Sequence, residues 1–228
     1  VKKAAEDPYA QSFQADGFTL GVACNSTAED STAPADGKNG AIKMYVEFAA
    51  AAVDGEGKIL ACVTDAIQPS HEVDDFGEIV GVTYKGTKKE LGYDYNMVKY
   101  SNATLEWFEQ VENLEKWVVG KTAEDIKNIE TRVNEEGYNV AVDEELFASC
   151  SISLEAFQEA IVKACNDEKG STFTAVPGSF TLGVSAISNS TESVSAADSE
   201  DGNAMVKMYT EFGAAAVDAD GKILAALT

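Results

Sequence analysis

The chain has 228 residues, of which 39 are acidic and 17 basic, so its formal net charge is −22. Such a negative field repels nucleic acids and anionic lipid head groups, and we expect no nucleic-acid partner. The 45% of hydrophobic and 9% of aromatic residues are typical of a folded protein. Since no window reaches the roughly 18 to 20 apolar residues of a membrane span, we expect membrane contact only through a lipid anchor or tether.

Residues 1–16 are polar, begin without Met and carry no signal-peptide pattern. We expect them to form a lead-in, a tether between a processed or lipid-bearing N-terminus and the first domain. That domain is expected to span residues 17–167.

Two parts of the chain share sequence. Residues 18–22 recur as 180–184, and residues 41–62 match residues 205–226 at 15 of 22 positions. In the first copy the pattern predicts strands near 18–24, 42–53 and 58–67, with a polar loop near 25–40. Asp and Gly in the turn at 54–57 favour a hairpin, because they tolerate positive φ.

The second copy is partial. Residues 168–179 are expected to be a linker, and residues 180–228 to hold only the strands and hairpin of the repeat. Three outcomes stay open: the partial copy packs on the first domain, it forms a swapped dimer with another chain, or the natural chain continues beyond Thr228. A hairpin with one strand is marginal alone, so it must find a partner.

Helices are expected between the two copies, after a short strand near 78–85. Residues 103–119 carry an apolar stripe at helical spacing, with Ser101 or Asn102 as the N-cap. A second helix begins at Thr122, where Asp125 completes a capping box. A third spans 153–166 with Ser153 as its cap. We therefore predict an α+β fold, in which helices pack on one face of a twisted, mainly antiparallel sheet.

The four cysteines are Cys24, Cys62, Cys150 and Cys165. The second copy has alanine at both positions that correspond to Cys24 and Cys62. This joint loss predicts that the two side chains are neighbours on adjacent strands, where an exported protein could oxidise them to a disulfide. Independent variation between Cys and Ala at two small buried sites is the alternative.

Other motifs indicate structure rather than chemistry. We expect no metal site, since no CxxC or CxxH spacing occurs and His71 has no second metal-ligating residue at a suitable spacing. His71 lies in an acidic, Pro-containing segment and is expected to be solvated. The tripeptide at 120–122 follows a helix and lacks the first glycine of a phosphate loop, so it is better explained as a helix C-cap followed by an N-cap.

Three segments resemble the FMN-binding domain family of exported and membrane-anchored electron-transfer proteins. The hairpin at 54–63 is similar to the D-G-K-I-x-x-V strand pair of that family, and residues 119–126 are similar to its V-G-K-S-A-E-D-I segment. Residues 145–153, which lead into the last helix, lie where the family has D-x-x-S-G-A-T-x-[ST]. The chain is also similar to uncharacterised clostridial-type surface lipoproteins with the same departures from this motif.

The resemblance implies a flavin site. In family members with covalent flavin the motif's Thr is esterified by the FMN phosphate, and Ser151 falls at that position. Ser149 replaces the motif's Gly, Cys150 its Ala, and Glu145 its Asp. The candidate cofactor-binding residues are therefore Ser149, Cys150 and Ser151, and the candidate cofactor is FMN.

Two functions follow from the resemblance. The first is an extracytoplasmic FMN-binding-like module, at the cell surface or secreted, that serves electron transfer or binds a small ligand. The second is a structural or interaction module of a bacterial surface lipoprotein that has kept the fold and lost the cofactor. We expect no enzymatic activity, and a hydrolytic enzyme built on His71 ranks behind both.

Overall fold

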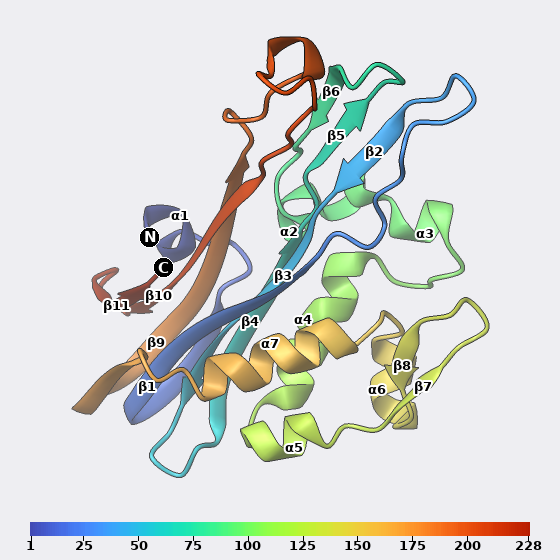
Figure 1. Cartoon of the computed structure of the whole chain (residues 1–228). Helices are drawn as coiled ribbons and strands as arrows, with labels where there is room; N and C mark the ends of the chain where they lie inside the picture. Colours follow the sequence, from blue (N-terminus) through green and yellow to red (C-terminus); the bar gives the residue numbers. More distant parts are fainter.

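The computed structural model describes residues 1–228, apart from the side chains of residues 174–176. The protein has an α+β fold with a mainly antiparallel sheet, as the sequence predicts (Figure 1). Six strands form the main sheet in the order β11-β10-β9-β1-β3-β4. They are β1 (Gln11–Thr27), β3 (Tyr45–Val53), β4 (Ile59–Ile67), β9 (Ser171–Asn189), β10 (Tyr209–Asp218) and β11 (Ile223–Leu227).

The two segments that share sequence form corresponding strands in the same register. Val22 of β1 lies opposite Ala50 of β3, and the corresponding Val184 of β9 lies opposite Ala214 of β10. The hairpins β3–β4 and β10–β11 also share a register shift at the same place, between residues 52 and 53 in one and 216 and 217 in the other. The hairpin predicted at 54–57 is confirmed.

Strands β1 and β9 join the two segments at the centre of the sheet. They pair antiparallel, with Phe13 opposite Phe180 and Phe18 opposite Phe173. Phe18 and Phe180 are equivalent in sequence, so each half presents similar residues to the other across an approximate two-fold axis between the two strands. The second segment packs against the first within one chain, which is the first of the outcomes considered; the swapped dimer and the longer natural chain stay predictions.

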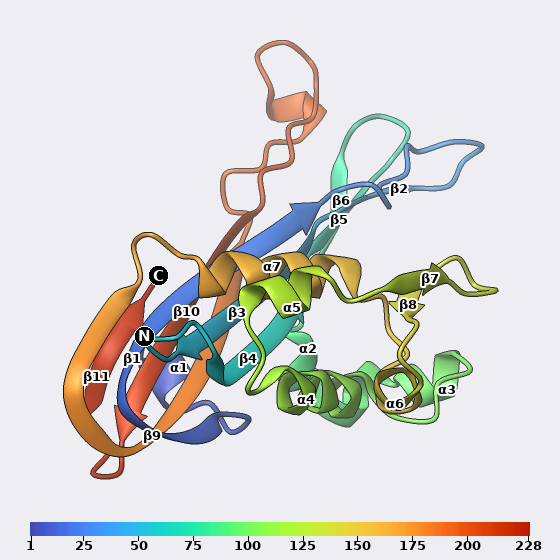
Figure 2. The same ribbon diagram turned by 90° about the horizontal axis from the view of Figure 1, so that it is seen from below.

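The main sheet is curled (Figure 2), and its two halves share an inner core of buried side chains. Equivalent aromatic rings meet there: the centroids of Phe18 and Phe180 are 5.3 Å apart, and those of Phe48 and Phe212 are 5.9 Å apart. Alternate alanines of the runs in β3 and β10 belong to the same core as these rings. Burial of each Phe contributes roughly 1.5–3 kcal/mol, so this core holds the halves together.

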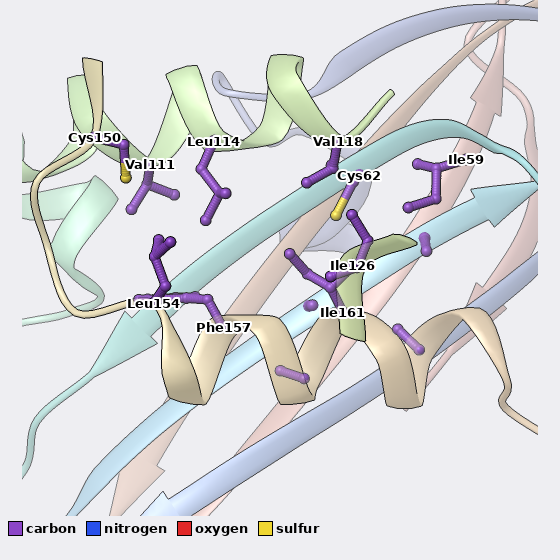
Figure 3. Close-up of a cluster of buried hydrophobic side chains, with 14 of the residues drawn as sticks. Ile59, Cys62, Val111, Leu114, Val118, Ile126, Cys150, Leu154, Phe157 and Ile161 are labelled. Atoms are coloured by element: carbon purple, nitrogen blue, oxygen red, sulfur yellow. The ribbon is translucent and has the colours of Figure 1, made fainter. Parts of the chain in front are cut away.

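Helices cover the outer face of the first half. Helix α7 (Glu155–Cys165) lies across β1 and β3, α4 (Trp107–Val118) packs beside β4, and α5 (Ala123–Lys127) lies against α7. Figure 3 shows Val111 and Leu114 of α4 facing Leu154 and Phe157 at the start of α7. The apolar stripe predicted for α4 is buried at Val111, Leu114 and Val118.

The predicted helix boundaries differ at two N-termini. Helix α4 begins after Glu106, whose carboxylate forms a capping box with Glu109, so the prediction of Ser101 or Asn102 as N-cap is wrong. Helix α7 begins after Leu154 without a side-chain cap, so Ser153 is not its cap. The capping box of Thr122 and Asp125 is confirmed at α5.

Helix α1 (Lys2–Ala5) lies on the second half of the sheet as α7 lies on the first. A Cβ atom on Gly21 would lie 2.0 Å from the Ala164 carbonyl oxygen, and one on Gly183 would lie 2.2 Å from the Ala4 carbonyl oxygen. Each helix is followed by an aspartate that accepts a strand N–H. Asp167 accepts that of Val22 at 3.2 Å, and Asp7 accepts that of Val184 at 2.9 Å.

These contacts correct two predicted boundaries. Residues 1–16 are not a tether: they form α1 and the beginning of β1. Residues 168–179 are not simply a linker, because β9 starts at Ser171. A weak sequence match could have indicated this role for the N-terminal residues: residues 1–13 match residues 161–173, with identities at Lys3, Ala4, Asp7 and Phe13.

The remaining elements surround the cleft described below or extend one end of the sheet. A second sheet has the order β2-β5-β6, and β7 and β8 form a separate hairpin. The predicted strand at 78–85 corresponds to β6. The bounds are β2 (Gly40–Lys43), β5 (Ser70–Val73), β6 (Ile79–Thr83), β7 (Thr131–Val133), β8 (Asn139–Ala141), α2 (Lys88–Leu91), α3 (Met97–Tyr100), α6 (Glu144–Ser149) and the 3₁₀ helices η1 (Gly92–Tyr95) and η2 (Ala196–Asp198).

Candidate functional site

The three residues that the resemblance places at a flavin lie at the end of α6 and in the loop that follows it, and their side chains point to different places. Asp143 caps α6 by accepting the Leu146 N–H at 2.8 Å. Ser149, near the end of α6, donates its hydroxyl back to the carbonyl of Leu146 at 3.1 Å. Cys150 is fully buried and points into the outer core, which is the cluster of buried side chains between the helices and the outer face of the sheet (Figure 3). Of the three, Ser151 alone lines the cleft beside the loop.

This cleft has a volume of about 1370 Å³ and is open to solvent. Its walls come from the end of β3, helix α2, the segment from η1 to α4, the β7–β8 hairpin and the loop before α7. They contain Asp30, Tyr45, Glu47, Gln68, Lys88, Tyr95, Met97, Lys99, Tyr100, Ser101, Asn102, Ala103, Trp107, Arg132, Val133, Asn134, Glu135, Glu136, Tyr138, Phe147, Ser151, Ile152, Ser153 and Phe157. Small-ligand sites usually measure about 300–1,000 Å³, so this cleft can admit a drug-sized molecule.

Aromatic rings and cations alternate on the cleft walls. The ammonium of Lys88 lies 5.1 Å from the ring centroid of Tyr95 and 5.0 Å from that of Trp107. Across the cleft, the guanidinium of Arg132 lies 4.8 Å from the ring of Phe147. Cations over ring faces are held by the ring quadrupole, so both charges are positioned at the wall.

Acidic and phenolic groups at the β3 end of the cleft are partly desolvated. Burial raises the pKa of Glu47, and the nearby Lys88 opposes that rise. Burial and a hydrogen bond with Asp30 raise the pKa of Tyr45 to about 12, so its phenol stays protonated at neutral pH. The cleft therefore offers both cationic groups and neutral hydrogen-bonding groups to a ligand.

Ser151 is fixed from behind by a buried glutamine of α4. Its backbone N–H and its hydroxyl both donate to Oε1 of Gln110, at 2.8 and 3.1 Å. Gln110 in turn donates its amide to the Leu105 carbonyl at 3.0 Å. The resemblance identified Ser151, but no local motif marked Gln110, Lys88 or Arg132, since they are spread along the chain and meet only in the fold.

A second polar cluster lies on the other side of α4 and covers the free edge of β4. Lys89 and Glu115 are each 2% exposed, and their Nζ and Oε1 atoms are 2.6 Å apart. Burial raises the pKa of Glu115 to about 7, against the opposing effect of Lys89. Burial also raises the pKa of Asp65 to about 6.

The backbone of β4 explains this cluster. Its outward N–H groups need acceptors because no strand of the described structure pairs with that edge. Cys62 donates to Gln11 Oε1 at 2.8 Å, Thr64 to Glu115 Oε1 at 2.6 Å, and Ala66 to the carboxylate of Asp65 at 2.7 Å. We interpret the cluster as structural.

The cysteines do not form the expected pair. Cys24 lies in β1 and Cys62 in β4, and β3 runs between the two strands, so the expectation of adjacent strands is wrong. Their cross-strand partners, Phe48 and Ala51, belong to the inner and outer cores respectively, which places the two thiols on opposite faces of the sheet. All four cysteines are free thiols.

His71 is buried in β5, with 1% of its surface exposed, so the expectation of a solvated loop residue is wrong. Among the described residues, neither Nδ1 nor Nε2 has a hydrogen-bond partner. Burial lowers the pKa of His71. No group of three or more His, Cys, Asp or Glu residues suited to a metal ion occurs in the part of the chain that the structure describes.

Comparisons with known proteins add no relative. No protein-family model matches the chain, and neither a curated protein nor a solved structure matches it. Among the described helices, none has the length and apolar character to cross a membrane.

Proposed function

We propose that this chain is an extracytoplasmic FMN-binding-like module, which binds a flavin or another planar small molecule for electron transfer or ligand capture. The observation that carries the proposal is the position of Ser151. It supplies the hydroxyl that the family motif would have there, and it opens into a cleft with aromatic walls. On this proposal, residues 17–167 form the module and the second segment repeats its strands.

The cleft residues fit a flavin that is bound without a covalent link. Tyr95, which is half-buried, offers its ring to an isoalloxazine, since aromatic pairs prefer offset or edge-on contacts, and the buried Trp107 packs against Tyr95. Arg132, Lys88 and Lys99 offer cations to a phosphate, for which Arg is suited by its fork of donors. FMN bound there would supply one- and two-electron chemistry, while the chain would bind and orient it.

The alternative is a structural or interaction module of a surface lipoprotein that has lost the cofactor. The loop before α7 favours it. Ser149 stands where the family has Gly, and Cys150 is turned into the core. A Gly at that point lets backbone approach a phosphate closely, and the present loop lacks that freedom.

Titration of the full chain with FMN tests the proposal, with binding measured as the quenching of flavin fluorescence. Saturable binding is expected, and Tyr95→Ala should weaken it by about threefold to tenfold, the value of one aromatic contact. Tyr93→Ala is the matched control, because Tyr93 lies in the same 3₁₀ helix, is 69% exposed and does not line the cleft. Lys88→Ala and Lys85→Ala form a second pair.

The two functions predict different results. A module that binds flavin loses affinity in Tyr95→Ala and Lys88→Ala while the controls bind as the unmodified chain does. A colourless protein that binds neither FMN nor riboflavin contradicts the proposal and favours the module without a cofactor. Intact mass decides whether any bound flavin is covalent.

A further inference from the structure

Gln110 determines what Ser151 can offer to a ligand. The side chain of Gln110 is 2% exposed, and its Oε1 atom faces both the N–H and the hydroxyl of Ser151. The orientation of this amide is fixed by its partners. Backbone N–H groups only donate, and the Leu105 carbonyl at the other end only accepts, so Oε1 must face Ser151 and Nε2 must face Leu105.

The hydroxyl proton of Ser151 therefore points away from the cleft. Oε1 of Gln110 is an acceptor, so the Ser151 hydroxyl must donate to it. A hydroxyl has one proton and two lone pairs, and with the proton engaged only lone pairs remain for the cleft. Toward a ligand, Ser151 is a hydrogen-bond acceptor.

Most of the backbone N–H groups around Ser151, three of the five in residues 150–154, are engaged as well. The Cys150 N–H donates to the Leu146 carbonyl at 2.7 Å, and the Leu154 N–H donates to the Asn139 carbonyl at 2.8 Å. With the Ser151 N–H held by Gln110, three amides of this short loop already have partners. Phosphate sites need several free N–H groups that converge on one point.

We infer that Gln110 is a positioning residue that leaves Ser151 to accept a hydrogen bond from the ligand. The group that Ser151 recognises is then a donor, such as the imide N–H of a planar heterocycle, rather than a phosphate. This inference rests on the proposed function and sharpens it: the ligand's N–H faces Ser151, and Ser151 carries no phosphoester. The ligand class is a neutral ring system with a donor at its edge.

Two flavin probes without phosphate test the ligand part. Lumiflavin carries the imide N3–H, and 3-methyllumiflavin lacks it. The unmodified chain should bind lumiflavin about fivefold more tightly than the methylated probe, the net worth of one hydrogen bond. Ser151→Ala should abolish this preference, while Ser149→Ala, whose side chain bonds back into α6, should keep it.

Amide hydrogen exchange tests the Gln110 contact without any ligand. The backbone amide of residue 151 should exchange slowly both in the unmodified chain and in Ser151→Ala, because this N–H donates to Gln110 in both proteins. Gln110→Met should expose that amide to exchange. Gln158→Met is the control: the Gln158 amide donates to the carbonyls of Ile126 and Lys127, and its loss should leave Ser151 protected.

Each result counts for or against the inference. A fast-exchanging Ser151 amide in the unmodified chain overturns it, as does equal affinity for the two probes or a flavin covalently attached at Ser151. If Ser151 is protected but no flavin binds, the proposed function fails while the Gln110 contact stands. A protected amide with the N–H preference supports both.

Discussion

His71 carries two buried ring nitrogens without hydrogen-bond partners among the described residues. Burial lowers its pKa, so below about pH 6.5 the unfolded chain binds a proton that the folded chain resists. Stability from this residue is present above that pH and is lost as the pH falls through it. We therefore compare the free energies of unfolding of His71→Leu and the unmodified chain, measured with urea. The difference in favour of the variant should be larger at pH 5 than at pH 8.

The control for that experiment keeps a ring but no titration. His71→Phe should show the same flattened pH dependence as His71→Leu, whatever its absolute stability. If both variants keep the acid-dependent loss of the unmodified chain, then His71 does not cause it.

Lys89 and Glu115 form a buried ion pair at the edge of β4. Removing one member leaves the other charge buried and unpaired, which typically costs about 3–5 kcal/mol. Lys89→Met should therefore lower the free energy of unfolding by about that amount. Lys116→Met is the matched control, since Lys116 pairs with Glu112 at the surface and such exposed pairs are worth about 0–1 kcal/mol. Equal losses in the two variants would contradict a buried pair.

At the scale of elements, two glycines let helices approach the sheet. Gly21→Ala would place a methyl group 2.0 Å from the Ala164 carbonyl oxygen of α7. The helix must shift, and overpacking of this kind costs roughly 1–3 kcal/mol. Gly55→Ala, in a hairpin turn with open space around it, should change the melting temperature little. A tolerated Gly21→Ala would show that α7 does not pack as described.

Asp7 anchors α1 to β9 as Asp167 anchors α7 to β1. Asp7→Ala should deprive the Val184 N–H of its acceptor and cost roughly 1.5–3 kcal/mol, as expected for a hydrogen bond to a charged group. Faster exchange of the Val184 amide is the direct readout. Glu6→Ala, which removes an exposed neighbouring carboxylate, should leave that amide protected.

The elements found from sequence were those encoded locally. The hairpin at 54–57 and the capping box at Thr122 depend on residues within a few positions of one another, and both are as predicted. The role of residues 1–16 was missed because it depends on contact with β9, about 170 residues away. The strand at Ser171 was missed because Gly170, Pro177 and Gly178 around it are typical of a linker.

The candidate site shows the same division. Ser151 was identified because a motif of nearby residues marks it. Lys88, Tyr95 and Arg132 come from separate elements and reach the cleft only after folding. The burial of His71 was missed because the acidic residues beside it suggested solvent, whereas alternation along β5 turns His71 and Val73 inward.

At the scale of the whole molecule, the inner core couples the two halves through equivalent residues. Phe48 and Phe212 stack across it with centroids 5.9 Å apart. In a double-mutant cycle, Phe48→Leu and Phe212→Leu should show a coupling of about 0.5–1.5 kcal/mol, the added worth of an aromatic pair. Phe157→Leu, in the outer core, should be additive with Phe212→Leu.

The approximate two-fold symmetry also restricts how the sequence can change. Near the axis, a residue's neighbour is its own counterpart, so a larger side chain in one segment takes space from the other. Drift at position 48 should therefore be compensated at position 212, and drift at 18 at position 180. Related sequences should vary in pairs at these positions, although each pair is separated by more than 150 residues.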